Sequence, residues 1–293
     1  MTSAKKLDQF YTSQKVADNS METLRGILPT LGYTDVTFLE PSAGTGAFLK
    51  ALRPDEKWIA GDLDPKYPGV QTKNFLEDFL ETPGKDETVV IGNPPFGKKS
   101  SLAVEFVNTA FKYSDTVAFI VPVQFRRFGI QTKLPYHAEL VWDSDCPSDS
   151  FVFEGKPYDV RCCFQVWTVR ESSLEDKRVR TKPPVNHPEF DAWIYNATPD
   201  ALHTFEKDWD FAVLRQGWGD FTPIMKKDAK DLSKKVQWIF FKGHTPEVTE
   251  RLLKLDFDTL AAGNTSVKGF GKADAVGEYI RLYGLPKISG GLF

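Results

Sequence analysis

Cysteine is scarce in this 293-residue chain, and long apolar runs are missing from it. The three cysteines, two of them adjacent at Cys162 and Cys163, form neither a disulfide framework nor a paired zinc-binding spacing. The longest apolar runs, such as residues 117–123, are far too short to span a bilayer, and residues 1–5 lead into no signal-peptide core. The four histidines lack the spacing of a metal site. These absences predict a soluble cytoplasmic protein without a metal, whose thiols pack as small apolar groups.

The chain also has no large excess of one charge, because it contains 37 basic and 40 acidic residues and its formal net charge is -3. No overall positive field indicates a polyanionic partner, so any surface for nucleic acid must be local. The hydrophobic fraction of 41% is that of an ordinary globular protein with a sizeable core. Disorder is therefore excluded as the general interpretation.

Short apolar runs alternate with helical patterns in the first half of the chain. Strands buried on both faces are predicted over residues 36–40, 58–62, 88–92 and 116–121. An apolar stripe at helical spacing predicts a helix over residues 100–113. This alternation predicts a doubly wound, mainly parallel α/β sheet. Because residues 171–184 are charged and contain prolines, we expect a linker there, with one domain over residues 1–180 and a smaller one over 181–293.

The first chemical signal is a glycine turn, Glu-Pro-Ser-Ala-Gly-Thr-Gly at residues 40–46. A buried strand ends in an acidic residue and a glycine turn leads at once into a helix, so backbone can approach a ligand where no Cβ intrudes. The spacing differs from the dinucleotide fingerprint because Leu49 fills the third glycine position. The next strand ends at Asp62, with Asp64 two residues on, and supplies a carboxylate where a ribose diol would lie. A nucleotide-containing cofactor is the predicted ligand.

The second signal is sharper, because Asn93-Pro94-Pro95-Phe96 follows directly on the predicted strand 88–92. Two successive prolines stiffen the loop and remove two backbone donors, so the loop presents acceptors. The side-chain oxygen of Asn93 and the carbonyl of Pro94 can each accept one hydrogen of a planar amine. Phe96 would then stack on the ring that carries this amine. An ordinary proline turn beside a core phenylalanine explains neither the asparagine nor the position two strands after the glycine turn.

In this order, residues 40–46 and 93–96 resemble the cofactor and catalytic motifs of the amino-group DNA methyltransferases, N6-adenine branch, and the likeness covers roughly residues 7–169. The resemblance implies S-adenosylmethionine as cofactor and the N6 amine of adenine as methyl acceptor. The run at residues 8–12 is similar to the amino-terminal motif that holds the methionine end of the cofactor, and residues 74–80 resemble the segment that reads its adenine. The implied cofactor-binding residues are Tyr11, Thr12, Glu40, Ser42, Gly44, Gly46, Asp62, Asp78, Phe79 and Asn93. The implied catalytic residues are Asn93, Pro94, Pro95 and Phe96.

Residues 150–167 resemble the late hairpin whose aromatic side chain packs on the target base in this family. The resemblance implies this role for Phe164, with Phe151 and Phe153 as rivals. The order of the motifs is similar to the γ arrangement, which implies a target-recognition region at the carboxyl end. Because a duplex adenine is paired and stacked, we expect the target to be flipped between rings such as Phe96 and Phe164.

Three reactions remain open as interpretations. Methylation of adenine N6 in DNA leads, and the same reaction on RNA is the alternative, because Phe96 stands where tyrosine is commoner in the DNA enzymes. A glutamine-amide protein methyltransferase has a similar loop, but such enzymes usually carry an amino-terminal extra domain, and little precedes Asp8 here. The predicted partner is therefore DNA, or alternatively RNA. A restriction endonuclease is a further candidate partner. The oligomeric state stays open.

Basic side chains in three places are candidate phosphate contacts. Two places adjoin predicted strands at the ligand edge of the sheet and hold Lys98, Lys99, Arg126 and Arg127. The third is the stretch 215–242, where seven basic residues against three acidic ones are interleaved with aromatic rings. Its candidates are Lys226, Lys227, Lys234 and Lys235. A solvated charged face is the alternative in each place, and the glycine-rich stretch 267–272 is a further candidate for a contacting loop.

Overall fold

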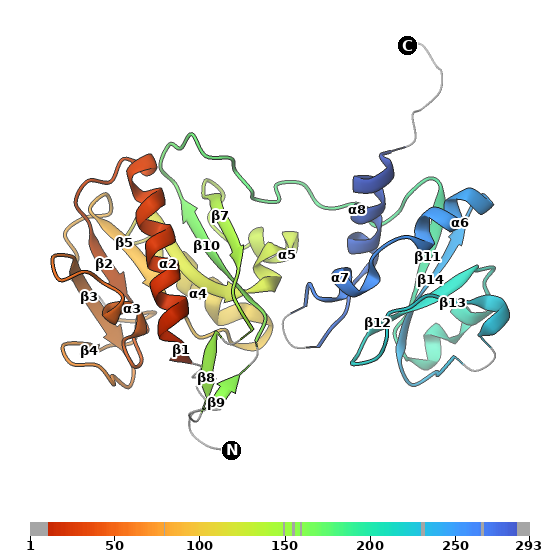
Figure 1. The fold of residues 1–293 in the computed structure, drawn as a ribbon, viewed down its shortest axis with the longest axis horizontal. Coiled ribbons are helices and arrows are strands. Elements are labelled where there is room, and N and C mark those ends of the chain that lie inside the picture. Colours follow the sequence, from red (N-terminus) through yellow and green to blue (C-terminus); the bar gives the residue numbers. More distant parts are fainter. Residues whose placement is uncertain are drawn as a thin grey trace, which may run out of the picture. The chain divides into compact units, whose positions relative to one another are not determined.

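A computed structural model of the protein describes residues 11–285, apart from 79, 149, 154, 155, 159, 230, 231, 265 and 266. The chain divides into two compact units, Met1–Arg180 and Thr181–Phe293 (Figure 1). Each unit has its own cluster of buried apolar side chains. Each unit therefore has its own sheets and its own hydrophobic core.

The first unit contains a seven-stranded main sheet. Its strands are β2 (Thr37–Glu40), β3 (Lys57–Asp62), β4 (Gln71–Thr72), β5 (Thr88–Gly92), β6 (Thr116–Pro122), β7 (Glu139–Asp145) and β10 (Cys162–Thr168). Their order is β4-β3-β2-β5-β6-β10-β7. The neighbours from β4 to β6 are parallel, whereas β10 is antiparallel to both β6 and β7. A second, antiparallel sheet with the order β1-β8-β9 joins β1 (Tyr11–Thr12), β8 (Phe151–Phe153) and β9 (Lys156–Tyr158).

Helices cover both faces of the main sheet. They are α2 (Gln14–Ile27), α3 (Ala47–Lys50), α4 (Ser101–Ala110) and α5 (Phe128–Gln131), with short 3-10 turns at η1 (Leu28–Leu31), η2 (Lys98–Ser100) and η3 (Val123–Arg126). The chain moves along the sheet in one direction from β2 to β3 and in the other from β5 to β6, so right-handed crossovers place α3 and α4 on opposite faces (Figure 1). This architecture confirms the predicted doubly wound, mainly parallel α/β fold.

The four predicted strands are present with ends within one residue of those expected, but the expected burial is wrong for β3. Strands β2, β5 and β6 are buried along their whole length, whereas Lys57 and Trp58 at the beginning of β3 are exposed. The reason is the short edge strand β4, which pairs only with Gly61 and Asp62. The first half of β3 therefore lies at the edge of the sheet, and only its carboxyl end is covered.

The order of the strands reverses between β2 and β5. At such a switch point the loops that follow the two strands leave in opposite directions and open a crevice outside the carboxyl ends of the strands. Glu40 ends β2 and Gly92 ends β5. The glycine turn and the Asn-Pro-Pro-Phe loop, each of which follows one of these strands, therefore begin side by side.

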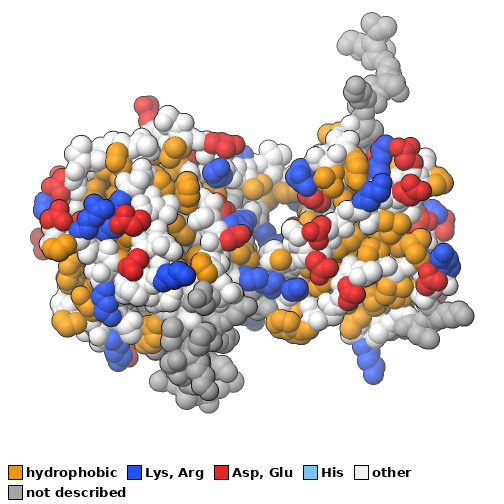
Figure 2. Space-filling model, in the orientation of Figure 1, with side chains coloured by type: hydrophobic (Ala, Val, Ile, Leu, Met, Phe, Trp, Pro, Cys, Tyr) orange, Lys and Arg blue, Asp and Glu red, His pale blue; other side chains and the backbone are white. Residues whose placement is uncertain are grey.

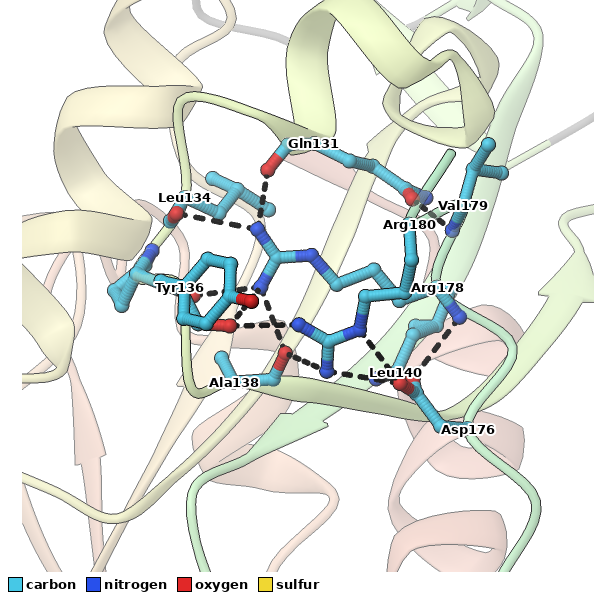
Figure 3. A network of polar contacts seen from close by, with 10 residues as sticks. Gln131, Leu134, Tyr136, Ala138, Leu140, Asp176, Arg178, Val179 and Arg180 are labelled. Carbon is cyan, nitrogen blue, oxygen red and sulfur yellow. Dashed lines mark hydrogen bonds and ion pairs between the residues drawn. The ribbon is translucent and has the colours of Figure 1, made fainter. Parts of the chain in front are cut away.

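The carboxyl end of the first unit is anchored by Arg178, which lies inside the predicted linker. The Arg178 guanidinium donates hydrogen bonds to five backbone carbonyls (Figure 3), those of Gln131 (2.7 Å), Leu134 (3.3 Å), Pro135 (2.6 Å), Tyr136 (3.3 Å) and Ala138 (2.7 Å). The Asp176 carboxylate also accepts hydrogen bonds from the backbone N–H groups of Leu140 and Arg178, both at 3.0 Å. The first part of the predicted linker is thus a fixed part of the first unit.

The second unit is built on a four-stranded antiparallel sheet with the order β11-β14-β12-β13, formed by β11 (Phe190–Tyr195), β12 (Phe211–Gln216), β13 (Ile224–Met225) and β14 (Gln237–Gly243). Its helices are α6 (Pro246–Leu253), α7 (Phe257–Ala261) and α8 (Lys272–Tyr283), with 3-10 segments η4 (Pro199–Glu206) and η5 (Lys226–Asp228). Aromatic rings dominate its core, as where Phe211 stacks on Phe241 with ring centroids 5.1 Å apart. Within the described residues of both units, none of the helices is long and apolar enough to cross a membrane.

Candidate active site

A cavity of about 440 Å³ opens at the carboxyl ends of β2 and β5. One part of its wall is formed by Tyr11 of β1 and by residues at the ends of β2, β3 and β4, namely Pro41, Ser42, Gly44, Asp62, Leu63, Asp64, Lys73, Asn74, Phe75 and Leu76. The other part follows β5 and consists of Asn93, Pro94, Pro95, Phe96, Gly97, Leu102 and Phe106. The structure therefore brings the two sequence motifs together around one cavity.

Two tyrosine rings occupy the space into which side chains at the two glycines of the turn after β2 would project. Gly44 has a left-handed φ of +50°, and a Cβ on it would lie 3.0 Å from the ring of Tyr11. Gly46 has a φ of +74°, and a Cβ on it would overlap the ring of Tyr67. Gly44 lines the cavity, but Gly46 does not. The missing side chain of Gly46 makes room for Tyr67, and a cofactor-binding role for Gly46 stays a prediction.

Asp62, at the end of β3, holds the glycine turn in place. Its Oδ2 accepts a hydrogen bond from the Gly44 backbone N–H at 2.7 Å, and its Oδ1 accepts one from the Asp64 backbone N–H at 2.7 Å. Each carboxylate oxygen keeps a further lone pair, so Asp62 can still accept hydrogen bonds from hydroxyl groups in the cavity. Asp64 is exposed and forms an ion pair of 2.6 Å with Lys66.

Glu40 is buried at the end of β2 and is only 2% exposed. Its Oε2 has no hydrogen-bond partner among the described residues. Burial, and secondly the negative charge of Asp62, raise the pKa of the Glu40 carboxyl well above its usual range. The Leu49 backbone N–H donates a hydrogen bond to this carboxyl, which partly offsets the rise of its pKa. The unpartnered Oε2 favours a nearby cation or donor, because leaving a buried oxygen unpaired is costly. Glu40 does not line the cavity itself but lies behind it, 3.4 Å from the position of a Cβ on Gly92.

The Asn-Pro-Pro-Phe loop is held at both ends. The Ser42 hydroxyl donates a hydrogen bond of 3.2 Å to the backbone carbonyl of Asn93, which ties the glycine turn to the loop. The Phe96 carbonyl accepts a hydrogen bond of 3.3 Å from the Ala103 backbone N–H in α4. The ring of Phe96 meets that of Phe151 edge-on, with centroids 6.1 Å apart and planes at 84°. The loop is therefore tied to the glycine turn at one end and to α4 at the other, and its aromatic ring packs on Phe151.

A strained turn follows this loop. Gly97 has a φ of +66°, and the non-glycine residues Lys99 and Ser100 have φ values of 54° and 61°. Such left-handed conformations cost a side-chain-bearing residue about 1–3 kcal/mol each, and they cluster where function requires them. Lys98 and Lys99 are exposed beside the cavity wall. Both of these predicted phosphate contacts thus lie next to the catalytic loop.

The structure does not bring Phe164 to the cavity. This residue lies in the middle of β10, opposite Ile120 and Ser144, and is 3% exposed in the core. The predicted hairpin ends earlier than expected, because residues 162–168 continue as a buried strand of the main sheet. The rival Phe151 contacts Phe96 instead, and the side chain of Phe153 lies outside the described residues.

The segment expected to read the cofactor adenine also differs from the prediction. The Asp78 carboxylate accepts a hydrogen bond of 2.6 Å from the Asn74 backbone N–H, so it closes its own turn, and it does not line the cavity. The cavity is lined instead by residues 73–76, which directly follow β4. Sequence reasoning missed Lys73 among them, because the two-residue strand β4 that precedes it is not among the predicted strands. Phe79 lies outside the described residues, and Thr12 pairs with Phe151 in the small sheet.

Arg126 is occupied by acidic side chains. Its guanidinium forms ion pairs of 2.5 Å with Asp143 and 2.6 Å with Asp145. Gln165 also donates a hydrogen bond of 3.1 Å to Asp143. The prediction of Arg126 as a phosphate contact is therefore corrected, because two carboxylates at the end of β7 already neutralise its charge. Arg127 beside it is half-buried.

The four candidate lysines of the second unit fall into two pairs. Lys226 forms an ion pair of 3.7 Å with Asp208 and lies 5.3 Å from the ring centroid of Trp209, and Lys234 lies 5.9 Å from that of Phe205. All four lysines are exposed, and only Lys226 and Lys234 have these charged or aromatic contacts with described residues. Basic and acidic side chains lie interspersed over the visible face of this unit (Figure 2). The predicted basic face is thus mixed in charge.

Comparison with known proteins found no matching protein-family model and no matching curated protein. A modification subunit assigned to a type I restriction enzyme of Vibrio vulnificus YJ016 is 18% identical at a TM-score of 0.41, over 56% of this chain and 45% of that chain. A protein of Pyrococcus horikoshii assigned as an RNA methyltransferase is 17% identical at a TM-score of 0.38, over 55% of this chain and 88% of that chain. A protein of Listeria monocytogenes assigned as a class I S-adenosylmethionine-dependent methyltransferase is 14% identical at a TM-score of 0.38, over 56% of this chain and 63% of that chain. At these values the likenesses assign no function to the chain.

Proposed function

We propose that this chain transfers a methyl group from S-adenosylmethionine to the N6 amine of adenine in DNA. The observation that supports this proposal is a single cavity with two chemically different walls. One wall is a glycine turn braced by Asp62, and the other is the acceptor-rich loop Asn93-Pro94-Pro95-Phe96. Both walls lie at the switch point of a doubly wound sheet, where such folds bind their ligands.

The residues around the glycine turn fit this cofactor. Asp62 keeps lone pairs for the hydroxyl groups of a ribose, and Leu63, Phe75 and Leu76 offer apolar wall to a purine ring. The buried Glu40 has an oxygen without a partner among the described residues, which suits the positive charge of an amino-acid ammonium group. When bound, S-adenosylmethionine supplies an electrophilic methyl group on a sulfonium.

The Asn-Pro-Pro-Phe loop makes the amine reactive. Adenine N6 is a poor nucleophile, because its lone pair is shared with the ring. In the proposed reaction the side-chain oxygen of Asn93 and the carbonyl of Pro94 each accept one amine hydrogen, which draws the lone pair out of conjugation with the ring and localises it on N6. Phe96 stacks on the purine and excludes water from it. The loop thereby contributes orientation and desolvation, and the surplus proton leaves to water after the transfer.

Access to a duplex adenine requires that the base leave the stack and enter the cavity. In this proposal Lys98 and Lys99 contact phosphates beside the flipped nucleotide, because they are exposed next to the cavity wall. Residues 181–293 form the proposed target-recognition region. Phosphate contacts fix the register of the substrate, while contacts to base edges read its sequence.

The test is transfer of labelled methyl groups from S-adenosylmethionine to separate pools of unmethylated DNA, RNA and protein, followed by analysis of nucleosides and amino acids. We expect label in N6-methyladenine from DNA. Because a contaminating host enzyme would give the same product, the Asn93→Ala variant purified in the same way serves as the control. Label in RNA adenine would move the substrate to RNA, and label on glutamine, or on nothing, would overturn the proposal.

A further inference from the structure

A short ladder outside the main sheet links the two walls of the cavity. Strand β1 pairs antiparallel with β8, so that Tyr11 lies opposite Val152 and Thr12 lies opposite Phe151. The Ser13 backbone N–H donates a further hydrogen bond of 2.8 Å to the carbonyl of Ser150. Two segments that are far apart in the sequence are thereby held in a fixed register.

One end of this ladder contacts the glycine turn. The ring of Tyr11 lies so close to Gly44 that a Cβ there would be 3.0 Å from the Tyr11 Cε1 atom. Tyr11 also lines the cavity. A ligand that occupies the turn therefore meets Tyr11, and any shift of this ring changes the position of β1.

The other end contacts the catalytic loop. Phe151 is 0% exposed and does not line the cavity, so it cannot reach a substrate itself. Its ring lies edge-on to Phe96, and the interplanar angle of 84° is that of a T-shaped aromatic pair. Such pairs have an orientation preference, so Phe151 fixes the plane of the Phe96 ring. Phe96 is the aromatic side chain of the loop that does line the cavity.

We propose that Phe151 is a positioning residue and that the β1–β8 ladder couples the two walls of the cavity. A ligand at the glycine turn holds Tyr11, the ladder transmits this constraint to Phe151, and Phe151 holds Phe96 in the orientation that stacks on a purine. The inference rests on the proposed function, because it requires a cofactor at the turn and a base at Phe96. Coupling of two binding sites is reciprocal, so a bound base also strengthens binding of the cofactor.

A second connection acts on a different part of the loop. The hydrogen bond from the Ser42 hydroxyl to the Asn93 carbonyl constrains the backbone that carries the acceptors. The ladder instead constrains the aromatic ring. Removing Phe151 should therefore disturb stacking of the base while leaving the acceptors in place.

The experiment measures how much S-adenosylhomocysteine tightens binding of an oligonucleotide to the full chain. The oligonucleotide has the sequence methylated in the pool experiment, with the fluorescent base 2-aminopurine at the target position. For the unchanged protein we expect the dissociation constant to fall by about 5- to 150-fold when S-adenosylhomocysteine is present, the usual range of coupling between sites. In Phe151→Leu this ratio should fall to near one and kcat should fall, while the affinity for S-adenosylhomocysteine alone stays unchanged.

One further variant separates coupling from simple loss of stability. Phe125→Leu is the matched control, because Phe125 is also 0% exposed in the first unit but belongs to neither the cavity wall nor the ladder. It should lower the melting temperature and keep the wild-type ratio.

The outcomes distinguish this inference from the proposed function. A wild-type ratio and kcat in Phe151→Leu would overturn the ladder as a coupling device while the methyl-transfer activity stands. If the leucine variant does not fold, Phe151→Met fills the same space without an aromatic ring and is subject to the same expectation. A protein that transfers no methyl group to adenine would overturn both proposals.

Discussion

The two units use their polar side chains in different ways. In the first unit, Asp62 and Asn93 line a cavity at the carboxyl ends of the sheet strands, and the buried Glu40 ends β2 between the strands that carry them. In the second unit, Asp210 shows the opposite arrangement, because its carboxylate accepts hydrogen bonds from Lys242 at 2.9 Å, from the Gly243 backbone N–H at 3.0 Å and from the Thr249 hydroxyl at 2.6 Å. The Asp62 carboxylate keeps lone pairs for hydrogen bonds to a ligand, whereas the Asp210 carboxylate uses its hydrogen bonds within the fold.

The two units also differ in where residues other than glycine have a positive φ. Among the described residues, three that are not glycine have a positive φ, and two of these, Lys99 and Ser100, directly follow the catalytic loop of the first unit. The third, Ala197, lies in the second unit. A strained conformation persists only where the surroundings impose it, and the two neighbouring strained residues lie beside the cavity of the first unit. The second unit, with its stacked aromatic core, is the more ordinary scaffold.

The largest expected effect tests whether the chemistry belongs to the first unit. Asn93→Ala removes the acceptor that the proposed reaction places on the substrate amine, so kcat for methyl transfer should fall by about 100-fold or more, as when one preorganised polar group is deleted from a reacting site. Affinity for S-adenosylmethionine should change little, because the glycine turn is intact. Methyl-transfer rates and calorimetric titration with the cofactor measure the two effects.

Asn108→Ala is the matched control for this prediction. Asn108 lies in α4 of the same unit and donates a hydrogen bond of 3.1 Å to the Lys133 carbonyl, away from the cavity. Its removal should leave kcat within about two-fold, since a typical single hydrogen bond of this kind is worth only about 1 kcal/mol of stability. Turnover of Asn93→Ala close to that of the control would remove the assigned role of the loop.

The next effect concerns binding of the cofactor. Gly44→Val should weaken it by about 10-fold or more, equivalent to about 1.4 kcal/mol, because a side chain at this left-handed position meets the Tyr11 ring. Asp62→Ala should weaken it similarly, since it removes the ribose acceptor and the brace on the Gly44 N–H. Gly129→Val provides a control, because a Cβ there meets nothing within 4 Å. Unchanged affinity in both test variants would place the cofactor elsewhere.

Prediction from the sequence succeeds where one local pattern determines the result. The strand at residues 88–92 has an apolar centre, Val89-Val90-Ile91, and the structure buries all five of its residues in the middle of the sheet. The residues Gly44, Asp62 and Asn93 each follow or end such a strand, and the switch point then brings them together. Their neighbourhood is therefore predictable from the strand pattern and the rules of parallel sheets.

Prediction fails where tertiary pairing decides. Phe164 and Phe151 both occur in apolar runs, and only the pairing of residues 162–168 with β6 and β7 shows that Phe164 belongs to the main sheet. Likewise, no sequence signal connects Arg126 with Asp143, because the strand register creates their contact. Nor does the motif at residues 40–46 reveal that a ring from another loop, that of Tyr67, lies at its second glycine.

A smaller effect tests the second unit as a surface for nucleic acid. Neutralising all four candidate lysines should weaken binding and flatten its salt dependence, by about 0.9 in logarithmic slope for each phosphate that the protein no longer neutralises, while the preference among sequences and the cofactor affinity stay unchanged. The contacts of the four lysines divide them into two pairs with different expected effects. The Lys227→Gln/Lys235→Gln pair should account for most of the change, because Lys226 and Lys234 already lie against Asp208 and aromatic rings.

Fluorescence anisotropy of labelled oligonucleotides at several salt concentrations measures this difference. The Lys226→Gln/Lys234→Gln pair is the internal control, since it removes the same formal charge from the same region. If all four substitutions together leave binding unchanged at every salt concentration, these lysines are a solvated face only. Residues 267–272 would then be the next surface to examine.

The smallest effect is a difference in the acid response of the two units. In the second unit His187 is 5% exposed, stacks on Phe190 with centroids 5.1 Å apart, and accepts a hydrogen bond of 3.3 Å from the Glu189 backbone N–H. Burial lowers the pKa of His187 from its ordinary value of 6.5. The fold therefore favours the neutral imidazole, and this stabilisation is present above pH 6.5 and is lost as the pH falls through the lower, folded-state pKa.

Glu40 of the first unit responds with the opposite sign. Because burial raises the pKa of its carboxyl, the fold favours the protonated form, and this contribution is complete at low pH and is lost as the pH rises through the raised pKa. Acidification from about pH 7 to about pH 5 should therefore lower the melting temperature of the second unit through His187 while Glu40 opposes such a loss in the first.

His187→Phe keeps a ring on Phe190 without a titrating group, so its melting temperature should depend less on pH, as differential scanning calorimetry of the full chain can measure. An equally steep pH dependence in His187→Phe would show that another group causes the acid response.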